Sequence, residues 1–279
     1  MNIHKAEKPF TMYLYEGSLP HRSDLLVPHR KDHYLIVFTR KATGVRQWID
    51  MQPYVLKDQT VYFTGPDNVI MKEDASLLWS TGMAFTSDFL TLAGTSLSGL
   101  PLLQNLQNVH ELNLNEADLL FMEEVLNRLQ LEYENPGEWQ QKMILANLSL
   151  LLTYLSRMYT EQYGKGVSAE KAFLKKYQAF IDQHFKKWHE VNNYADLLHV
   201  SAGHLGEVIK MQSGRPAIKH IHNRLVLEAK RLLVHSEQTS KEIAFDLGFA
   251  DSSYFNRFFK RETGQTPTGY RSGIRKMYQ

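Results

Sequence analysis

Between residues 34 and 89 the chain alternates short apolar runs with turn residues. Side chains that are β-branched or aromatic dominate four runs: Tyr34–Phe38, Val45–Ile49, Gln59–Phe63 and Ala75–Trp79. Glycines and the Gly-Pro-Asp-Asn stretch at 65–68 separate these runs, and no helical spacing lies between them. The pattern predicts an antiparallel sandwich or barrel rather than a parallel sheet.

Apolar residues next recur at helical spacing in two segments, about 116–131 and about 139–162. In the second segment five of them step by four and three residues in turn, which is a heptad seam. These are Ile144, Leu148, Leu151, Leu155 and Met158. Two interpretations stay open: the helix packs on its own sheet domain, or it forms the seam of a homodimer.

A break at residues 163–169 divides the chain. Beyond it the pattern is helical almost to the end, and the charge changes sign. The net charge is −5 over residues 1–169 and +7 over residues 170–279, although the whole chain carries only +2. We therefore expect two domains, 1–168 and 169–279, and a polyanion is an obvious partner for the basic one.

The basic domain repeats one pattern, at about 191–212 and about 240–263. Each copy has Ala-x-x-Leu, a short turn, an apolar triplet and a glycine. The triplets are Leu205, Val208 and Ile209 in the first copy and Phe255, Phe258 and Phe259 in the second. This spacing predicts two helix-turn-helix units within an all-α domain.

Local signals in the second copy agree with this interpretation. Thr239 and Glu242 have the spacing of a capping box that starts a helix. Gly248 can take the positive φ needed to leave that helix, and Asp251 can cap the next one. In the first copy His199 stands in place of the turn glycine, and Ser201 can act as the cap.

Residues 216–235 read as one helix between the two copies. About 20 residues at 1.5 Å each span roughly 30 Å, which is close to the ~34 Å turn of B-DNA. A rod of this length can hold two reading helices in successive major grooves on one face. The match favours double-stranded operator DNA as the partner.

These residues resemble the signature of the AraC/XylS transcription regulators. The resemblance is carried by Gly248-Phe249, Ser253-Tyr254-Phe255, Arg257-Phe258-Phe259-Lys260, Gly264, Pro267 and Tyr270-Arg271, with Arg224-Leu225, Ala229 and Leu232-Leu233 before them. It covers about residues 172–274 and extends more loosely to the N-terminal half. It implies an α+β protein of two domains. An antiparallel cupin-like β-barrel with dimerisation helices is expected first, followed by a domain of about seven helices.

The exposed face near the start of a reading helix supplies base contacts. In the second unit this face is Ser252, Ser253, Tyr254, Asn256 and Arg257, where Arg257 suits guanine and Asn256 suits adenine. The first unit offers Gly203, His204 and Glu207, with Ala202 and Gly206 beside them. It lacks long donors, so we expect it mainly to contact the DNA backbone. Candidates for phosphate contact are Lys219, Lys241, Lys260, Arg261 and Arg271.

The N-terminal domain is expected to bind a small-molecule effector. A pocket of apolar walls with polar anchors could be lined by Phe38, Arg40, Arg46, Trp48, Tyr62 and Trp79. His29 and His33 form the one close histidine pair of this half, and without a third ligand they predict no metal site. No cofactor and no catalytic residue are predicted. Residues 2–30 read as an arm across the barrel.

The sequence therefore predicts a cytoplasmic, dimeric regulator of transcription that is not an enzyme. RNA polymerase is a further candidate partner, and nothing in the sequence spans a membrane. Two alternatives stay open. One is a cupin-type enzyme with a helical appendage, and the other is a helical adaptor for protein contacts.

Overall fold

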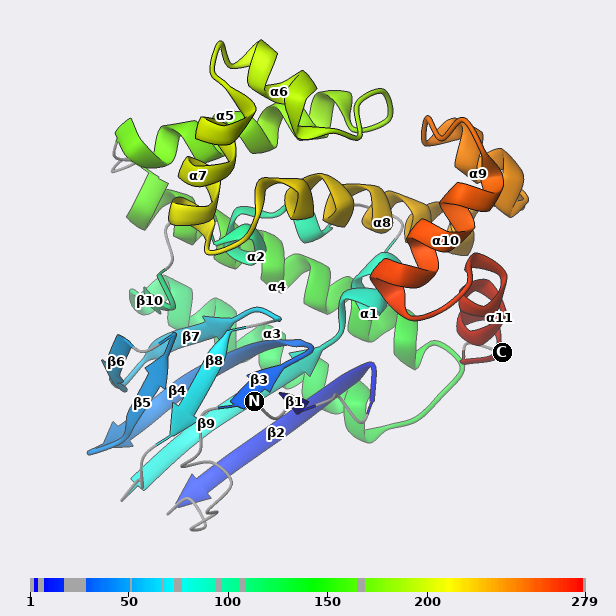
Figure 1. Cartoon of the computed structure of the whole chain (residues 1–279). Coiled ribbons are helices and arrows are strands. Elements are labelled where there is room, and N and C mark those ends of the chain that lie inside the picture. The colour runs from blue at the N-terminus through cyan, green and yellow to red at the C-terminus, as the bar shows by residue number, and fades with distance from the viewer. Residues whose placement is uncertain are drawn as a thin grey trace. The chain divides into compact units, whose positions relative to one another are not determined.

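The computed structural model describes residues 3–4, 8–17, 29–50, 52–66, 68–72, 77–93, 97–105, 109–164 and 169–277. They belong to two compact units, Met1–Lys165 and Gly166–Gln279 (Figure 1). The boundary predicted near residue 168 falls within 165–168, which lies outside the described residues. Across the described chain, no helix is both long and apolar enough to cross a membrane.

The N-terminal unit contains two five-stranded sheets, in the orders β1-β3-β8-β5-β6 and β10-β7-β4-β9-β2. Their strands are β1 (Ile3–His4), β2 (Phe10–Gly17), β3 (His29–Lys31), β4 (Tyr34–Thr43), β5 (Arg46–Ile49), β6 (Gln52–Val55), β7 (Thr60–Thr64), β8 (Val69–Lys72), β9 (Leu77–Phe85) and β10 (Glu111–Asn113). All pairs are antiparallel except the short β1–β3 pair. Among the described strands no ladder joins the two sheets, so the predicted barrel is not closed.

The N-terminal arm predicted over residues 2–30 is wrong where the chain is described. Residues Phe10–Gly17 form β2, which pairs along its whole length with β9, from Phe10 opposite Phe85 to Gly17 opposite Leu78. Tyr13 and Leu14 are exposed, so the strand is held by its backbone ladder more than by a buried side-chain pattern. Residues 18–28 of the expected arm lie outside the described residues.

Helices cover one face of the second sheet. The long ones are α3 (Glu116–Glu134) and α4 (Gln140–Tyr163), and the short ones are α1 (Ser87–Thr91), η1 (Leu97–Gly99) and α2 (Pro101–Gln104). Alternate residues of β4, β7 and β9, such as Ile36, Phe63 and Met83, pack with α3 and α4 in one core. Asn115 and Asp118 form a capping box that starts α3.

The heptad seam of α4 lies inside this core. Its five residues, Ile144, Leu148, Leu151, Leu155 and Met158, are between 0% and 5% exposed. A second copy of the chain cannot reach them while the unit is folded, so the seam predicted for a homodimer is wrong. The alternative interpretation, a helix packed on its own sheet domain, accounts for the spacing.

The C-terminal unit is helical throughout its described part. It contains α5 (Ala169–His184), α6 (Val191–Leu197), α7 (Ala202–Ser213), α8 (Ala217–His235), α9 (Ser240–Asp246), α10 (Ser252–Thr263) and α11 (Pro267–Met277). The pairs α6–α7 and α9–α10 are the two predicted helix-turn-helix units, and α8 runs between them (Figure 1).

Candidate nucleic-acid interface

The second helix-turn-helix is held at each end by the predicted local signals. Thr239 Oγ1 accepts from the Glu242 amide at 3.2 Å, and Glu242 Oε2 accepts from the Thr239 amide at 2.7 Å. Gly248 leaves α9 with φ +82°. The carboxylate of Asp251 accepts from the amides of Ser253 and Tyr254, at 3.1 and 2.9 Å. These two hydrogen bonds, with the charge of Arg257, hold the pKa of Asp251 below its usual range.

Aromatic side chains fix α10 against the rest of the unit. Phe255, Phe258 and Phe259 are buried, and Phe249 from the turn packs on the first two with ring centroids 5.2 and 5.3 Å apart. Phe259 in turn meets Tyr270 of α11 at 5.7 Å. The opposite side of α10 is therefore left to solvent.

That outer side carries the predicted base-reading residues. Ser253, Tyr254, Asn256 and Arg257 are exposed, and Ser252 is half-buried at the start of the helix. The side chains of Asn256 and Arg257 make no hydrogen bond within the described chain, and Asp251 supplies the opposite charge near Arg257. Both side chains are therefore available to a ligand at the start of α10.

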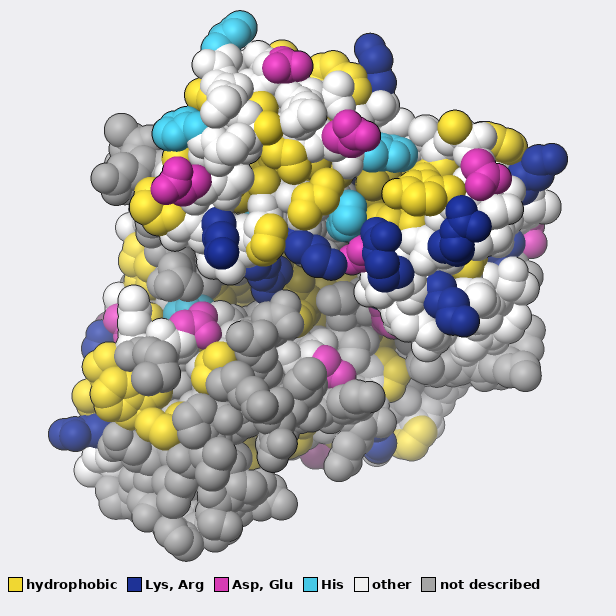
Figure 2. Space-filling view, in the orientation of Figure 1, with side chains coloured by type: hydrophobic (Ala, Val, Ile, Leu, Met, Phe, Trp, Pro, Cys, Tyr) yellow, Lys and Arg dark blue, Asp and Glu magenta, His cyan; other side chains and the backbone are white. Residues whose placement is uncertain are grey.

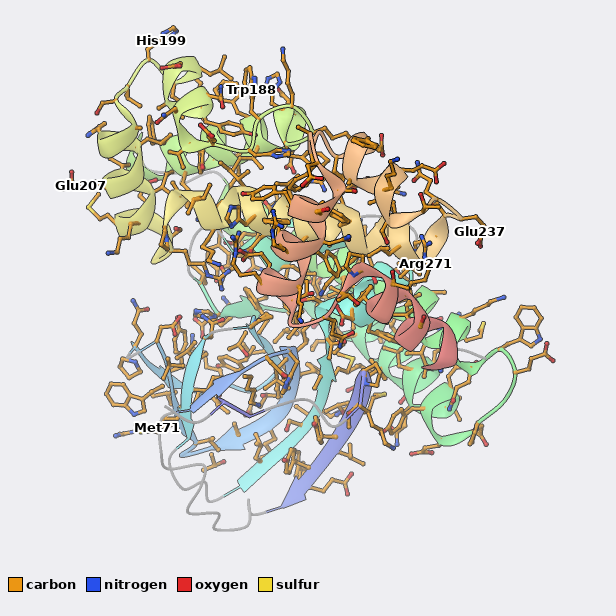
Figure 3. The ribbon with its side chains drawn as sticks, turned by 45° about the vertical axis from the view of Figure 1, so that its right-hand side comes forward. Met71, Trp188, His199, Glu207, Glu237 and Arg271 are labelled. Atoms are coloured by element: carbon orange, nitrogen blue, oxygen red, sulfur yellow. The ribbon has the colours of Figure 1, made fainter. Side chains whose placement is uncertain are left out.

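The first helix-turn-helix repeats this plan with different surface chemistry. Ser201 Oγ accepts from the His204 amide at 3.2 Å and caps α7, while Gly214 closes the helix with φ +70°, as Gly264 does for α10 with φ +79°. His199 takes the turn position with φ +57°. Figure 3 shows His199 and Glu207 projecting away from the helices.

The exposed face of α7 is nearly bare at its start. A Cβ added to Gly203 or Gly206 would meet nothing within 4 Å. Glu207 and His204 are both exposed. Lys210 is exposed one turn beyond Gly206 and occupies the place that Lys260 has in α10. The prediction omitted Lys210, although the 50-residue offset between the copies would have found it.

The five residues predicted to contact phosphate do not have equal freedom. Lys241 and Lys260 are exposed and carry no ion pair or hydrogen bond within the described chain. The prediction of Arg271 as a cation free to bind phosphate is wrong, because its guanidinium donates to the carbonyls of Leu233 and Ser236, at 2.8 and 3.3 Å. It satisfies the C-terminal carbonyls of α8, which is a structural role.

Glu262 neutralises the remaining two candidates. Its carboxylate is only 8% exposed and accepts from Lys219 Nζ at 2.7 Å, Arg261 Nε at 3.0 Å and His222 Nδ1 at 3.1 Å. Burial raises the pKa of Glu262, but the hydrogen bonds from Lys219 and Arg261 outweigh it and leave the pKa below its usual range. Lys219 on α8 therefore ties that helix to α10, whereas Arg261 pairs with its own neighbour within α10, and each is engaged before it can serve a phosphate.

Basic side chains gather between the two reading helices. Figure 2 shows Lys and Arg along the side of the C-terminal unit formed by α7, α8 and α10. The 19 residues of α8 correspond to a rod of roughly 28 Å at 1.5 Å per residue, which agrees with the length predicted from sequence. A basic band of this extent suits a polyanion that lies along both helices.

The predicted effector pocket is not assembled. Phe38 and Arg40 lie on the helix-covered face of their sheet, where the Arg40 guanidinium binds both carboxylate oxygens of Glu123 at 2.7 Å. Tyr62 lies on the other face, where its hydroxyl accepts from the Lys57 amide at 2.9 Å. The prediction that these residues line one pocket is wrong, because neighbouring positions on a strand point to opposite faces of the sheet.

The other three residues of that set lie apart as well. Trp79 is 47% exposed beside Lys41, and Arg46 is also exposed. Trp48 pairs with Met71 and lies on the face opposite to buried Gln47. Within the described chain, no group of three or more His, Cys, Asp or Glu side chains is placed to hold a metal ion. His33 bonds Asp32 at 2.9 Å, and the side chain of His29 lies outside the described residues.

Comparison with known proteins identifies the same helix-turn-helix region. A family model described as a helix-turn-helix domain matches residues 194–273, which contain both helix pairs. The curated relatives include the HTH-type transcriptional activator RhaS of Citrobacter koseri, 26% identical over 248 residues. The same activator of Escherichia coli strain SMS-3-5 is 28% identical over 250 residues. Each alignment covers 88% of this chain and 87% of the relative.

Solved structures with a similar sequence are also found. One is the C-terminal domain of AraT, a response regulator from Geobacillus stearothermophilus. It is 27% identical, covers 38% of this chain and 88% of its own, and has a TM-score of 0.36.

Proposed function

The chain belongs to the AraC/XylS family and is a DNA-binding regulator of transcription, and we propose that its two helix-turn-helix units make unequal contributions on the operator. The curated relatives are named transcriptional activators. These names favour a regulator over the cupin-type enzyme, and the helix-turn-helix match favours it over a protein adaptor. The observation that carries the proposal is the contrast between the exposed faces of α7 and α10.

On α10 the free guanidinium of Arg257 and the free amide of Asn256 read bases. An arginine can donate two hydrogen bonds to guanine O6 and N7, and an asparagine pairs likewise with adenine. Ser252, Ser253 and Tyr254 complete the contact near the N-terminus of the helix. Each bidentate contact discriminates between base pairs by roughly 1–3 kcal/mol.

On α7 the bare start of the helix lets the DNA backbone come close. Gly203 and Gly206 leave open space above the helix, so backbone amides near its start can reach a phosphate. Glu207 is the one acidic side chain on this face, and it can accept from cytosine N4. Lys210 and His204 supply donors beside it. We therefore assign to α7 mainly the positioning of the protein.

Lys210, Lys241 and Lys260 serve as phosphate contacts because no side chain among the described residues neutralises them. Each phosphate neutralised contributes about −0.9 to the slope of log K against log salt concentration. The experiment is selection of duplexes from a random pool by the full chain, followed by a salt titration of the selected motif. An enriched motif with salt-sensitive affinity supports the proposal. Salt-insensitive binding, or no enrichment after several rounds, would remove it.

We further propose that a small-molecule effector binds on the inner face of the second sheet. This face is opposite to α3 and α4 and packs toward the other sheet through Tyr62, Leu78 and Val45. Thr39 and Ser80 are paired across β4 and β9 on it. Their buried hydroxyls, with that of Thr64, have no hydrogen-bond partner in the described chain, and a buried polar group without a partner is costly.

Unpartnered hydroxyls suit a neutral ligand that both donates and accepts hydrogen bonds. Thermal unfolding of the full chain tests this. The panel contains neutral polyols and amides, with ionised carboxylic acids for comparison, and Thr39→Val is the matched variant. We expect a neutral compound to raise the melting temperature of the natural chain and not of the variant. A compound that stabilises both equally would place the effector elsewhere.

We propose that the homodimer uses the outer side of the α3–α4 hairpin rather than the buried seam. Large apolar side chains are exposed along this side. They are Leu120 and Leu131 on α3, Trp139 between the helices, and Met143 and Leu150 on α4. Sedimentation of the full chain over a range of concentrations tests the dimer.

A further partner and a cellular location are proposed from the regulatory function. The relatives' name, transcriptional activator, supports RNA polymerase as a further partner, because activation acts on the polymerase. The DNA target supports a cytoplasmic location, which imaging of a fluorescent fusion at the nucleoid would test.

A further inference from the structure

The segment Lys186–His189, between α5 and α6, lies against the turn of the second helix-turn-helix. His189 Nε2 is 2.9 Å from the Leu247 carbonyl oxygen, and its ring packs on Phe249 with centroids 4.5 Å apart. Lys186 Nζ lies 3.2 Å from both carboxylate oxygens of Asp246. The segment that leads into the first unit is thus bound to the second one, and we name Lys186–His189 the bracket.

The bracket comes closest to the turn where the backbone of Lys186 faces the backbone of Gly248. A Cβ added to Gly248 would lie 1.8 Å from the Lys186 carbonyl oxygen. The matching turn of the first unit shows that positive φ is not what requires glycine, since His199 adopts φ +57° there. Gly248 is therefore needed because the bracket occupies the space that a side chain would fill.

The two reading helices are consequently joined by two separate connections. One is α8, which contacts α6 and α7 of the first unit and α9 and α10 of the second. The other is the bracket, which enters α6 directly and holds the α9–α10 turn. A single helix leaves its end units free to rotate about the junctions, whereas a second attachment removes that freedom.

We propose that the bracket fixes the distance and rotation between α7 and α10, and that His189 is thereby a positioning residue for half-site spacing. This rests on the proposed two-unit reading of DNA. Inserting one base pair between two half-sites rotates one against the other by about 34° and moves it by about 3.4 Å. A rigid pair of units rejects such an insertion, whereas a pair joined only through α8 tolerates it.

The first test needs no DNA. The chain contains no cysteine, so spin labels can be attached after Met211→Cys on α7 and Lys241→Cys on α9, both at exposed positions. We expect a narrow distance distribution in the labelled full chain and a distribution at least twice as broad after His189→Ala. His189→Gln, which restores an N–H donor to Leu247, should narrow it again.

The matched control is His184→Ala. His184 packs on Trp188 with ring centroids 4.4 Å apart, and within the described residues its side chain makes no hydrogen bond, ion pair or ring contact with α9. It should leave the distribution narrow. An unchanged distribution in His189→Ala would overturn the bracket. If that variant fails to fold by circular dichroism, Asp246→Ala replaces it, because it removes the exposed Lys186 ion pair, and there too an unchanged distribution overturns the bracket.

The second test uses the duplex that the full chain selects from random sequence, with zero, one or two base pairs inserted between its half-sites. We expect one inserted pair to weaken binding of the natural chain about tenfold or more, and binding of His189→Ala less than about threefold. Broadened label distances with an unchanged insertion penalty would refute the positioning role. Failure to select any duplex would instead refute the proposed function and leave the label result standing.

Discussion

Replacing Gly248 by alanine separates two reasons for a glycine in a helix-turn-helix turn. The left-handed backbone alone costs an alanine roughly 1–2 kcal/mol. Gly264→Ala is the matched control for this term, because Gly264 has φ +79° and open space around it. Gly248→Ala pays the same backbone cost and also places a methyl group 1.8 Å from the Lys186 oxygen.

The second cost can be worked from the contacts that must separate. Relieving the clash requires a shift of more than about 1 Å, because atoms in van der Waals contact lie about 3.5 Å apart. The shift breaks the His189–Leu247 hydrogen bond, worth about 1 kcal/mol, and the packing of His189 on Phe249, worth about 0.5–1.5 kcal/mol. We therefore expect Gly248→Ala to cost about 2.5–4.5 kcal/mol and Gly264→Ala about 1–2 kcal/mol.

Hydrogen exchange of the full chain measures this difference locally. Peptides covering α9 and α10 report the free energy of opening of the second unit, and each 1.4 kcal/mol lost speeds exchange tenfold. Gly248→Ala should exchange in these peptides at least tenfold faster than Gly264→Ala. Equal rates in the two variants would refute the close approach of Lys186 as the reason for the glycine.

Three further outcomes follow from the structure. Arg271→Ala should lower the free energy of unfolding by about 1–3 kcal/mol, since it leaves carbonyls of α8 unpaired, without changing the salt slope of DNA binding, whereas Lys241→Ala should reduce that slope by about 0.9. Burial lowers the pKa of His220 to about 4, so the unfolded chain takes up a proton near pH 6.5 that the folded chain refuses. The free energy of unfolding should therefore fall as the pH drops from about 6.5 to about 4, and urea titrations of His220→Gln should show a flatter dependence. Leu148→Ala should destabilise the N-terminal unit by about 2–5 kcal/mol, whereas Leu150→Ala should leave thermal stability nearly unchanged and weaken self-association in sedimentation; the reverse pattern would restore the buried seam as the dimer contact.

The sequence predicted the helical unit well because its determinants are local. The capping box at Thr239, the cap at Asp251 and the closing glycine at Gly264 each act within one turn of chain, and the structure confirms all three. The exposed face of α10 follows from the burial of Phe255, Phe258 and Phe259 by simple helical geometry.

The remaining features depend on partners that are distant in sequence. Arg271 carries a charge like that of Lys241, and only the fold brings it to the carbonyl of Leu233, 38 residues away. The pocket residues were chosen by type, but strand register sends Phe38 and Tyr62 to opposite faces. A heptad spacing likewise describes burial against any apolar surface, so the α4 seam could not by itself distinguish a dimer from a core.

The central claim, a base-reading second unit and a mainly positioning first unit, is tested most directly by comparing Arg257→Ala with Lys260→Ala. Each full-length variant is measured against every single base-pair change in the selected duplex. Arg257→Ala should abolish discrimination at one or two base pairs, a loss of about 1–3 kcal/mol there, and leave the other preferences intact. Lys260→Ala should weaken binding to all sequences about equally. A uniform loss from Arg257→Ala, or unchanged preference at every position, would contradict the account.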